Sequence, residues 1–201
     1  MSTVTNVSAG KPAIGGAISS APLGTTLPED ATSTLAAAFK GLGYCSEDGL
    51  VNSNSPASEL VKAWGGDNVL NLQTDRPDTF KFKLLEVINI DVLKFAYGAD
   101  NVDGALSTGI SVAVNSKELP DQALVVDMIL RNGVLKRIVL PVARVTEIAD
   151  ITYADNSAIG YEVTVQAFPD EDGNTHYEYI QTPSSPTPGP NEDEEEEDST
   201  P

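Results

Sequence analysis

The sequence predicts a mainly β protein, a β-sandwich or β-barrel with one or two short α-helices. About eight strand-like segments follow one another at short intervals and are separated by turn sequences, as in sandwiches and barrels. In several segments apolar and polar residues alternate, which is the period of a half-buried strand. Helical patterns do not alternate with these strands, and this argues against a parallel α/β sheet.

Three regions are expected along the chain: an N-terminal arm at 1–20, a β-sandwich domain at 21–182 and a C-terminal tail at 183–201. The first region is rich in Gly, Ala, Ser and Thr and has little to bury. It is therefore expected to be a flexible arm that a partner orders, or simply a frayed terminus. The tail joins a Pro/Ser spacer to an acidic block and is expected to be disordered.

The domain is expected to begin with a short helix at 36–40. Asp30 or Thr32 is a suitable N-cap residue, and Gly41 or Gly43 is a suitable stop.

A long hairpin-like excursion is predicted next. A strand at 44–50 leads into the sequence VNSNSPAS at 51–58, which has the composition of a loop. A second strand begins near Glu59, the Gly-Gly-Asp sequence at 65–67 turns the chain, and residues 69–73 return in extended form.

An alternating strand and a short helix follow. Phenylalanine and leucine at every second position predict a strand at 80–85. Asn89 as N-cap, Asp91 in the first turn and Gly98 at the end predict a helix at about 89–97. Because this helix has only about two turns, packing must stabilise it. The predicted apolar stripe consists of Leu85, Ile88, Val92 and Phe95.

The second half is predicted to be strands joined by tight turns. The expected strands lie at 110–115, 124–131, 134–142, 145–153, 159–168 and 176–181. Asn132-Gly133 is a strong hairpin signal, since both residues tolerate the positive φ angles of a type I′ turn. Pro141 has no backbone N–H, so we expect it at an edge, at a bulge or at the end of its strand.

Charge and composition exclude several functions. The formal net charge is −18, and residues 1–182 keep 23 acidic against 12 basic residues, a charge of −11. Such a protein is not expected to grip DNA, because binding requires Lys and Arg to neutralise phosphates. A repulsive wall would nevertheless let DNA slide past. The single cysteine excludes an internal disulfide, and we find neither a signal peptide nor an apolar run of the ~20 residues that span a bilayer. We expect a soluble protein without membrane binding.

No residue pattern indicates catalysis, a cofactor or a metal site. No Gly-x-Ser-x-Gly elbow is present to supply a nucleophile for a triad with His176, which is expected to lie on a surface strand. Cys45 is expected to be a small apolar core residue. The DEDGN sequence at 170–174 resembles part of a calcium loop, but a solvated hairpin turn is the favoured interpretation. The DRPD sequence at 75–78 is interpreted as a turn whose carboxylates accept local N–H groups. We therefore do not expect an enzyme.

Two segments carry a resemblance to a known family. One is APLGTTLPEDATSTLAAAFKGLGYCSEDGL at 21–50, and the other contains KAWGGD and TDRPDTF and continues to a short helix that ends in Tyr-Gly. In these segments, and in the order of elements over most of 10–170, the chain resembles the major tail tube proteins of long-tailed (siphovirus-type) bacteriophages.

The resemblance implies a structural subunit of the virion tail, assembled in the host bacterial cytoplasm. Subunits of this family form hexameric rings, and the rings stack into a tube through which DNA passes into the host without specific binding. A stacking loop would lie at about 47–58, and the N-terminal arm would also cross between rings. Further partners would be a tape measure and a tail terminator. The candidate inter-ring contacts are Glu47, Asp48, Asn52, Asn54 and Ser55.

Two other classes remain open. The chain could be another virion structural protein, such as a tail terminator or a decoration protein. A calcium-dependent β-sandwich binding module is the third possibility.

Overall fold

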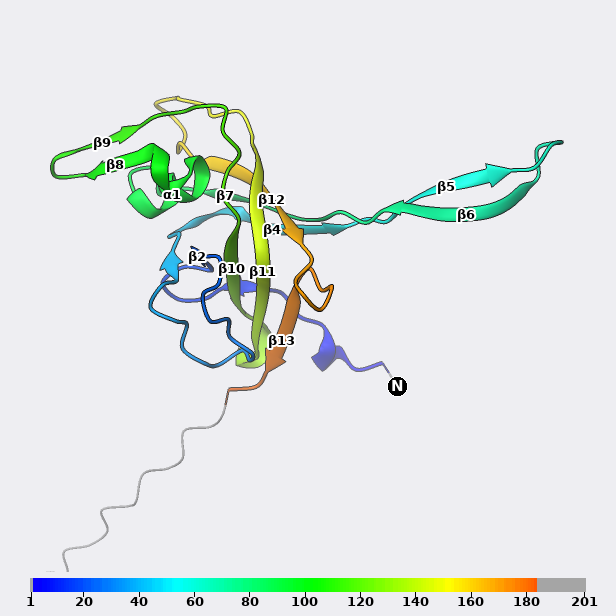
Figure 1. Ribbon diagram of the computed structural model, residues 1–201. Coiled ribbons are helices and arrows are strands. Elements are labelled where there is room, and N and C mark those ends of the chain that lie inside the picture. The colour runs from blue at the N-terminus through cyan, green and yellow to red at the C-terminus, as the bar shows by residue number, and fades with distance from the viewer. Residues whose placement is uncertain (1, 184–201) are drawn as a thin grey trace, which may run out of the picture.

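The computed structural model describes residues 2–183, and one antiparallel sheet of nine strands forms the body (Figure 1). Its main path follows the order β3-β2-β10-β11-β12-β7-β4, while β1 also pairs with β10 and β13 with β11. The strands are β1 (Lys11–Pro12), β2 (Ile18–Pro22), β3 (Lys40–Gly41), β4 (Cys45–Asn54), β7 (Asp78–Leu84), β10 (Gln122–Ile129), β11 (Leu135–Ile148), β12 (Tyr161–Phe168) and β13 (Tyr177–Gln181). The predicted mainly β class is confirmed.

The sheet curves until its two ends meet. The first and last strands of the path, β3 and β4, are consecutive in the chain and only residues 42–44 separate them. Leu42 N donates to Ile18 O (2.8 Å) on one side of this link, and Leu85 N donates to Tyr44 O (2.9 Å) on the other. The body is therefore barrel-like.

The core fills the concave side of this sheet. In β7 the side chains of Phe80, Phe82 and Leu84 are buried while Lys81 between them is exposed, so the predicted alternation is confirmed. The inward residues of β10, β11 and β12 join the same cluster.

Helix α1 (Ile90–Tyr97) closes the core and agrees with the prediction. Asn89 Oδ1 accepts a hydrogen bond from Asp91 N (3.0 Å), and the helix ends at Gly98, whose φ is 91°. Phe95 stacks on Phe82 with 6.1 Å between ring centroids. Two members of the predicted stripe are wrong, because Leu85 and Ile88 precede the N-cap and the helical period does not apply to them. Ile88 is exposed.

The β10–β11 hairpin turns at Asn132-Gly133, whose φ angles are 61° and 76°, as predicted. The predicted strands 134–142 and 145–153, however, form the single strand β11, which ends at Ile148. Pro141 interrupts nothing, because it lies where the register of β10 against β11 shifts. On the other side of β11, the pairing with β13 ends at Val139 and the pairing with β12 begins at Val142, so Pro141 has no partner there. A bulge was among the expected positions.

The helix predicted at 36–40 is wrong. Phe39 N donates to Ala36 O in one turn, and the chain enters β3 at Lys40, which leaves no room for a helix. Upstream, Asp30 Oδ1 accepts from the N–H groups of Thr32 (2.6 Å) and Ser33 (2.5 Å) without starting one. Arg137 Nη1 donates to the carbonyl oxygens of Asp30 and Ser33 (3.1 and 2.8 Å), which fixes this segment on the outer face of the sheet.

The sheet incorporates part of the predicted N-terminal arm. Residues 11–12 form β1 and residues 18–22 form β2, with Ile18 buried in the core, so the boundary at residue 20 moves towards the N-terminus. The predicted disordered tail lies, apart from Pro183, outside the described residues. No helix among residues 2–183 is long and apolar enough to cross a membrane.

Two smaller elements lie outside the nine-stranded sheet. A second hairpin consists of β8 (Val102–Ala105), which was not predicted, and β9 (Gly109–Val112), which is shorter than the strand expected at 110–115. Single turns of 3-10 helix occur at Val4–Asn6, Ala99–Asn101 and Arg131–Gly133.

Candidate assembly interface

A two-stranded hairpin projects far from the barrel (Figure 1). It consists of β5 (Ala57–Lys62) and β6 (Asn68–Asp75), which we call the projecting hairpin. At its tip Ala63 N donates to Asp67 O (2.8 Å), and the glycines at 65 and 66 adopt φ angles of 115° and 100°. The predicted excursion with its Gly-Gly-Asp turn is confirmed.

The loop predicted at 51–58 is wrong as secondary structure. β4 runs to Asn54, β5 begins at Ala57, and only residues 55–56 lie between them. Residues 51–54 pair with residues 78–81 of β7. Their polar composition reflects a strand that is exposed to solvent, whereas composition alone suggested a loop.

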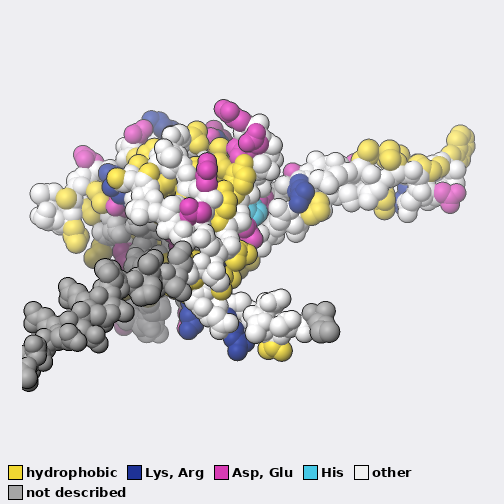
Figure 2. Space-filling model, turned by 90° about the horizontal axis from the view of Figure 1, so that it is seen from below, with side chains coloured by type: hydrophobic (Ala, Val, Ile, Leu, Met, Phe, Trp, Pro, Cys, Tyr) yellow, Lys and Arg dark blue, Asp and Glu magenta, His cyan; other side chains and the backbone are white. Residues whose placement is uncertain are grey.

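The projecting hairpin has one apolar face. Directly paired residues share a face of a two-stranded sheet, and Val61 pairs with Leu70 while Glu59 pairs with Leu72. On the other face Leu60 pairs with Asn71 and Ser58 with Gln73. Figure 2 shows hydrophobic side chains gathered along the outer part of the hairpin.

No described residue of the protein covers these apolar side chains. Leu70 is 52% exposed, Leu72 47%, and Trp64 at the tip is completely exposed at 107%. An isolated two-stranded hairpin is only marginally stable in water. A contiguous exposed apolar surface commonly marks a site of protein interaction. The hairpin therefore has the properties of a surface that a partner completes.

A buried carboxylate anchors the root of the hairpin. Asp78, whose side chain is 1% exposed, starts β7 where the hairpin rejoins the barrel. Its Oδ1 accepts from Asn52 Nδ2 (2.8 Å), and its Oδ2 accepts from Thr175 Oγ1 (2.6 Å) and lies 2.6 Å from His176 Nδ1. Asp78 thus connects β4, β7 and the segment before β13.

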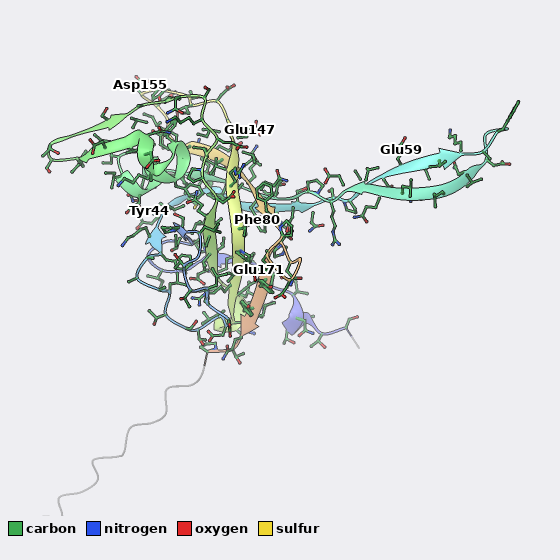
Figure 3. The ribbon with its side chains drawn as sticks, viewed as in Figure 1. Tyr44, Glu59, Phe80, Glu147, Asp155 and Glu171 are labelled. Atoms are coloured by element: carbon green, nitrogen blue, oxygen red, sulfur yellow. The ribbon has the colours of Figure 1, made fainter. Side chains whose placement is uncertain are left out.

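Hydrogen bonding controls the charge of this carboxylate. Burial alone would raise the pKa of Asp78, but the hydrogen bonds from Thr175, Asn52 and His176, together with the attraction of His176, outweigh it and lower the pKa below its ordinary value. The ring of His176 also packs edge-on against Phe80, which Figure 3 labels near the root of the hairpin, with 5.3 Å between centroids.

Two expectations about these residues are corrected. His176 precedes β13 and is largely buried, because its side chain is 19% exposed and its ring contacts Asp78 and Phe80. In the DRPD turn, Asp75 Oδ1 accepts from Arg76 N (2.7 Å) as expected, whereas Asp78 is bound by groups from distant parts of the chain.

The five predicted contact residues lie along β4 and its exit, and the structure does not gather them into one cluster. Glu47 and Asp48 are exposed near the start of β4, where Ser46 Oγ donates to Asp48 Oδ2 (2.8 Å). Asp48 lies in the irregular stretch between Cys45 and Leu50, where the register of β4 against β7 shifts, whereas Asn52 and Asn54 lie in the regularly paired part of β4. Asn52 binds Asp78, Asn54 Oδ1 accepts from Arg76 Nε (3.0 Å), and Ser55 lies in the turn before β5.

The remaining reactive groups are engaged in the fold. Burial raises the pKa of the Cys45 thiol to about 11, which keeps it protonated at neutral pH, and Cys45 packs against the core. Asp170 Oδ1 accepts from the N–H groups of Asp172 and Asn174, so DEDGN is a hairpin turn. Across residues 2–183, no group of three or more His, Cys, Asp or Glu side chains is placed to hold a metal ion.

Sequence reasoning did not predict the apolar face of the projecting hairpin or the buried position of Asp78, although the sequence contains an indication of each. Residues 69–73 read Val-Leu-Asn-Leu-Gln, and the alternation at 70–73 places both leucines on one face of a strand. The inward positions of β7 are 80, 82 and 84, and the same parity places Asp78 on the buried side. Nothing local indicates that Thr175 and His176 are its partners.

Comparisons with known proteins relate the chain to one family. The family model described as Phage tail tube protein matches residues 5–189, from before β1 to beyond β13. A comparison with curated proteins gives no match.

Proposed function

Because the chain belongs to the phage tail tube protein family, and is therefore a structural protein of a virion tail, we propose that it assembles into stacked hexameric rings that form a channel for DNA. Assembly with itself and with other tail proteins follows from the family. The number of subunits, the stacking and the passage of DNA are our proposal.

The observation that carries the proposal is the projecting hairpin. It exposes Leu70 and Leu72 on β6 and Trp64 in the turn at its tip, and the hairpin has no core of its own. Burying one such side chain contributes about 1.5–3 kcal/mol, so a few of them supply a stable contact. We propose that the hairpin of one ring contacts the neighbouring ring.

Its geometry suits a repeating contact. The eight residues of β6 extend about 26 Å, which takes the tip well beyond the barrel. A contact between a protruding hairpin and a different surface of the next subunit is heterologous, and such contacts repeat without closing. They also cover the outer edges of β5 and β6, which would otherwise attract uncontrolled strand pairing.

The charge of the body supports a channel that DNA passes without binding. Residues 1–182 carry a net charge of −11, and few cationic side chains are available to neutralise phosphates. A wall of this kind keeps DNA mobile.

Further contacts belong to the same proposal. All five candidate inter-ring contacts are exposed along the path to the hairpin: Glu47, Asp48, Asn52, Asn54 and Ser55. The N-terminal segment would cross between rings. A tape measure and a tail terminator would bind the finished tube, which is assembled in the bacterial cytoplasm.

The hairpin proposal is tested with Leu70→Ser/Leu72→Ser against the matched control Leu106→Ser, which changes an exposed leucine outside the hairpin. The purified proteins are compared by sedimentation velocity and negative-stain microscopy. We expect rings and tubes for the unaltered chain and the control, and only monomers or single rings for the double variant. Tubes of unchanged length in the double variant would refute the role of the hairpin.

A further inference from the structure

A groove at the turn of the β10–β11 hairpin brings together two cationic side chains and no acidic one. Residues 7–9 and Lys11 form one wall and residues 129–133 the other, around a volume of about 610 Å³. Ser8 Oγ accepts a hydrogen bond from Arg131 N (2.7 Å), which joins the two walls. Lys11 is held in place by strand pairing opposite Ile129.

This charge distribution is unusual for a chain with a net charge of −18. Neither Lys11 nor Arg131 forms an ion pair with any residue in the range 2–183. The groove beside α1 differs, because its lysines share the walls with carboxylates. Its charged residues are Lys40, Lys94, Lys117, Asp91, Asp100, Glu118 and Asp121.

The described chain ends close to the groove. Lys11 pairs with Ile129, Ile129 with Leu135, and Leu135 with Gln181, so these residues form one row across four adjacent strands. Three strand spacings separate the ends of the row, a distance of about 14 Å. The last residue of β13 therefore lies about 14 Å from Lys11, on the same side of the barrel.

The sequence beyond β13 supplies a complementary charge. Seven consecutive acidic residues occupy positions 192–198, and nine residues at 183–191 precede them. Nine residues span at most about 30 Å, which exceeds the distance to the groove. Without Lys11 and Arg131, residues 1–182 carry 23 acidic and 10 basic residues, a net charge of −13 that repels this acidic run, whereas Lys11 and Arg131 attract it.

We propose that the groove between residues 7–11 and 129–133 binds the acidic run at 192–198 of the same chain. Arg131 offers a planar guanidinium that pairs with a carboxylate through two hydrogen bonds, and Lys11 adds a second charge. The bound run covers the exposed residues 7–9, and so links the N-terminal segment to the C-terminal one. Because the groups are exposed, salt weakens the contact, with a screening length of about 8 Å at 0.15 M.

Carbodiimide cross-linking tests this contact in the full-length chain. The reagent joins a carboxylate to a lysine amine that it touches, and mass spectrometry identifies the linked residues. Equal amounts of unlabelled and nitrogen-15-labelled chain are mixed at low micromolar concentration, so that links within one chain differ in mass from links between chains. Lys40 and Lys117, which are both exposed, serve as internal references.

We expect links from Lys11 to 192–198 within one chain, several-fold more abundant than those from the reference lysines. Arg131→Gln and 0.5 M NaCl should each reduce them several-fold. Arg131→Lys, which keeps the charge but not the paired hydrogen bonds, should reduce them less than Arg131→Gln does. Lys117→Gln should leave them unchanged. Links spread evenly over the lysines, insensitivity to Arg131→Gln, or links only between chains would overturn the proposal.

Discussion

His176 Nδ1 lies 2.6 Å from Asp78 Oδ2, and the two residues are 98 positions apart in the chain. This contact joins the segment before β13 to the start of β7, at the point where the projecting hairpin leaves the barrel. The direction of the hairpin therefore depends on a buried polar cluster whose centre is Asp78. A tube subunit needs such a rigid root, because the tip of the hairpin multiplies any small rotation.

Asp78→Asn should destabilise the fold by roughly 1–3 kcal/mol, because an amide has only one acceptor oxygen. If that oxygen keeps the hydrogen bonds of Thr175 and His176, the amide NH2 group faces the donor Nδ2 of Asn52 and that hydrogen bond is lost. Urea denaturation followed by circular dichroism measures the change. Asp75→Asn is the matched control, because its side chain is exposed and accepts only a neighbouring N–H group. We expect that control to stay within about 0.5 kcal/mol of the unaltered chain. Equal losses in the two variants would contradict the anchoring role.

The contribution of Asp78 should depend on pH in the acidic range. The pKa of Asp78 is lower in the folded protein than its ordinary value of 3.8, so the unfolded chain takes up the proton first as the pH falls. The stabilisation is complete above about pH 4 and is lost as the pH falls through the folded pKa. The difference in unfolding free energy between the unaltered chain and Asp78→Asn should therefore shrink below pH 4. A difference that grows on acidification would have the wrong sign.

Gly43→Ala should cost about 2–4 kcal/mol. The φ of Gly43 is 70°, and an added Cβ would overlap with Glu86 Cδ. Moving Glu86 breaks its hydrogen bonds with Tyr44 N (3.1 Å) and Asn89 Nδ2 (2.9 Å), each contributing about 1 kcal/mol, in addition to the backbone strain.

Gly24→Ala measures the cost of backbone strain without the displacement of Glu86. Gly24 also has a positive φ, 84°, but nothing lies within 4 Å of the added Cβ, so only strain of about 1 kcal/mol remains. Thermal denaturation compares the two variants. A loss at Gly43 no larger than the loss at Gly24 would show that Glu86 moves without cost.

Local signals in the sequence were sufficient for elements that a few neighbouring residues determine. Asn89 and Gly98 set the limits of α1, and Asn132-Gly133 sets the β10–β11 turn. In each case the side chain or the backbone freedom that determines the element belongs to the element itself.

Elements that depend on distant residues were predicted less well. Residues 30–33 follow a path that hydrogen bonds from Arg137, more than 100 positions away, help to fix. β11 continues through Pro141 because two neighbouring strands leave a gap there. The hairpin itself was predictable from its glycine turn, but Thr175 and His176 reach Asp78 only through the fold.

Trp64→Ala should impair assembly without affecting the folded monomer. Trp64 is completely exposed at the tip, so its removal leaves no cavity, whereas aromatic anchors at interfaces commonly contribute 2 kcal/mol or more. Tyr153→Ala is the control, since it also removes an exposed aromatic residue. We expect a critical concentration for tube formation at least about tenfold higher for Trp64→Ala, measured by light scattering. Equal effects of the two substitutions would show that the tip is not a contact.

In our proposal, the projecting hairpin of each subunit joins one ring to the next. A cryo-electron microscopy reconstruction of tubes formed by the purified chain tests it most directly. We predict sixfold rings in which residues 57–75 lie against the neighbouring ring, with Trp64, Leu70 and Leu72 buried there. A reconstruction in which this hairpin remains in solvent, or contacts only subunits of its own ring, would contradict the claim.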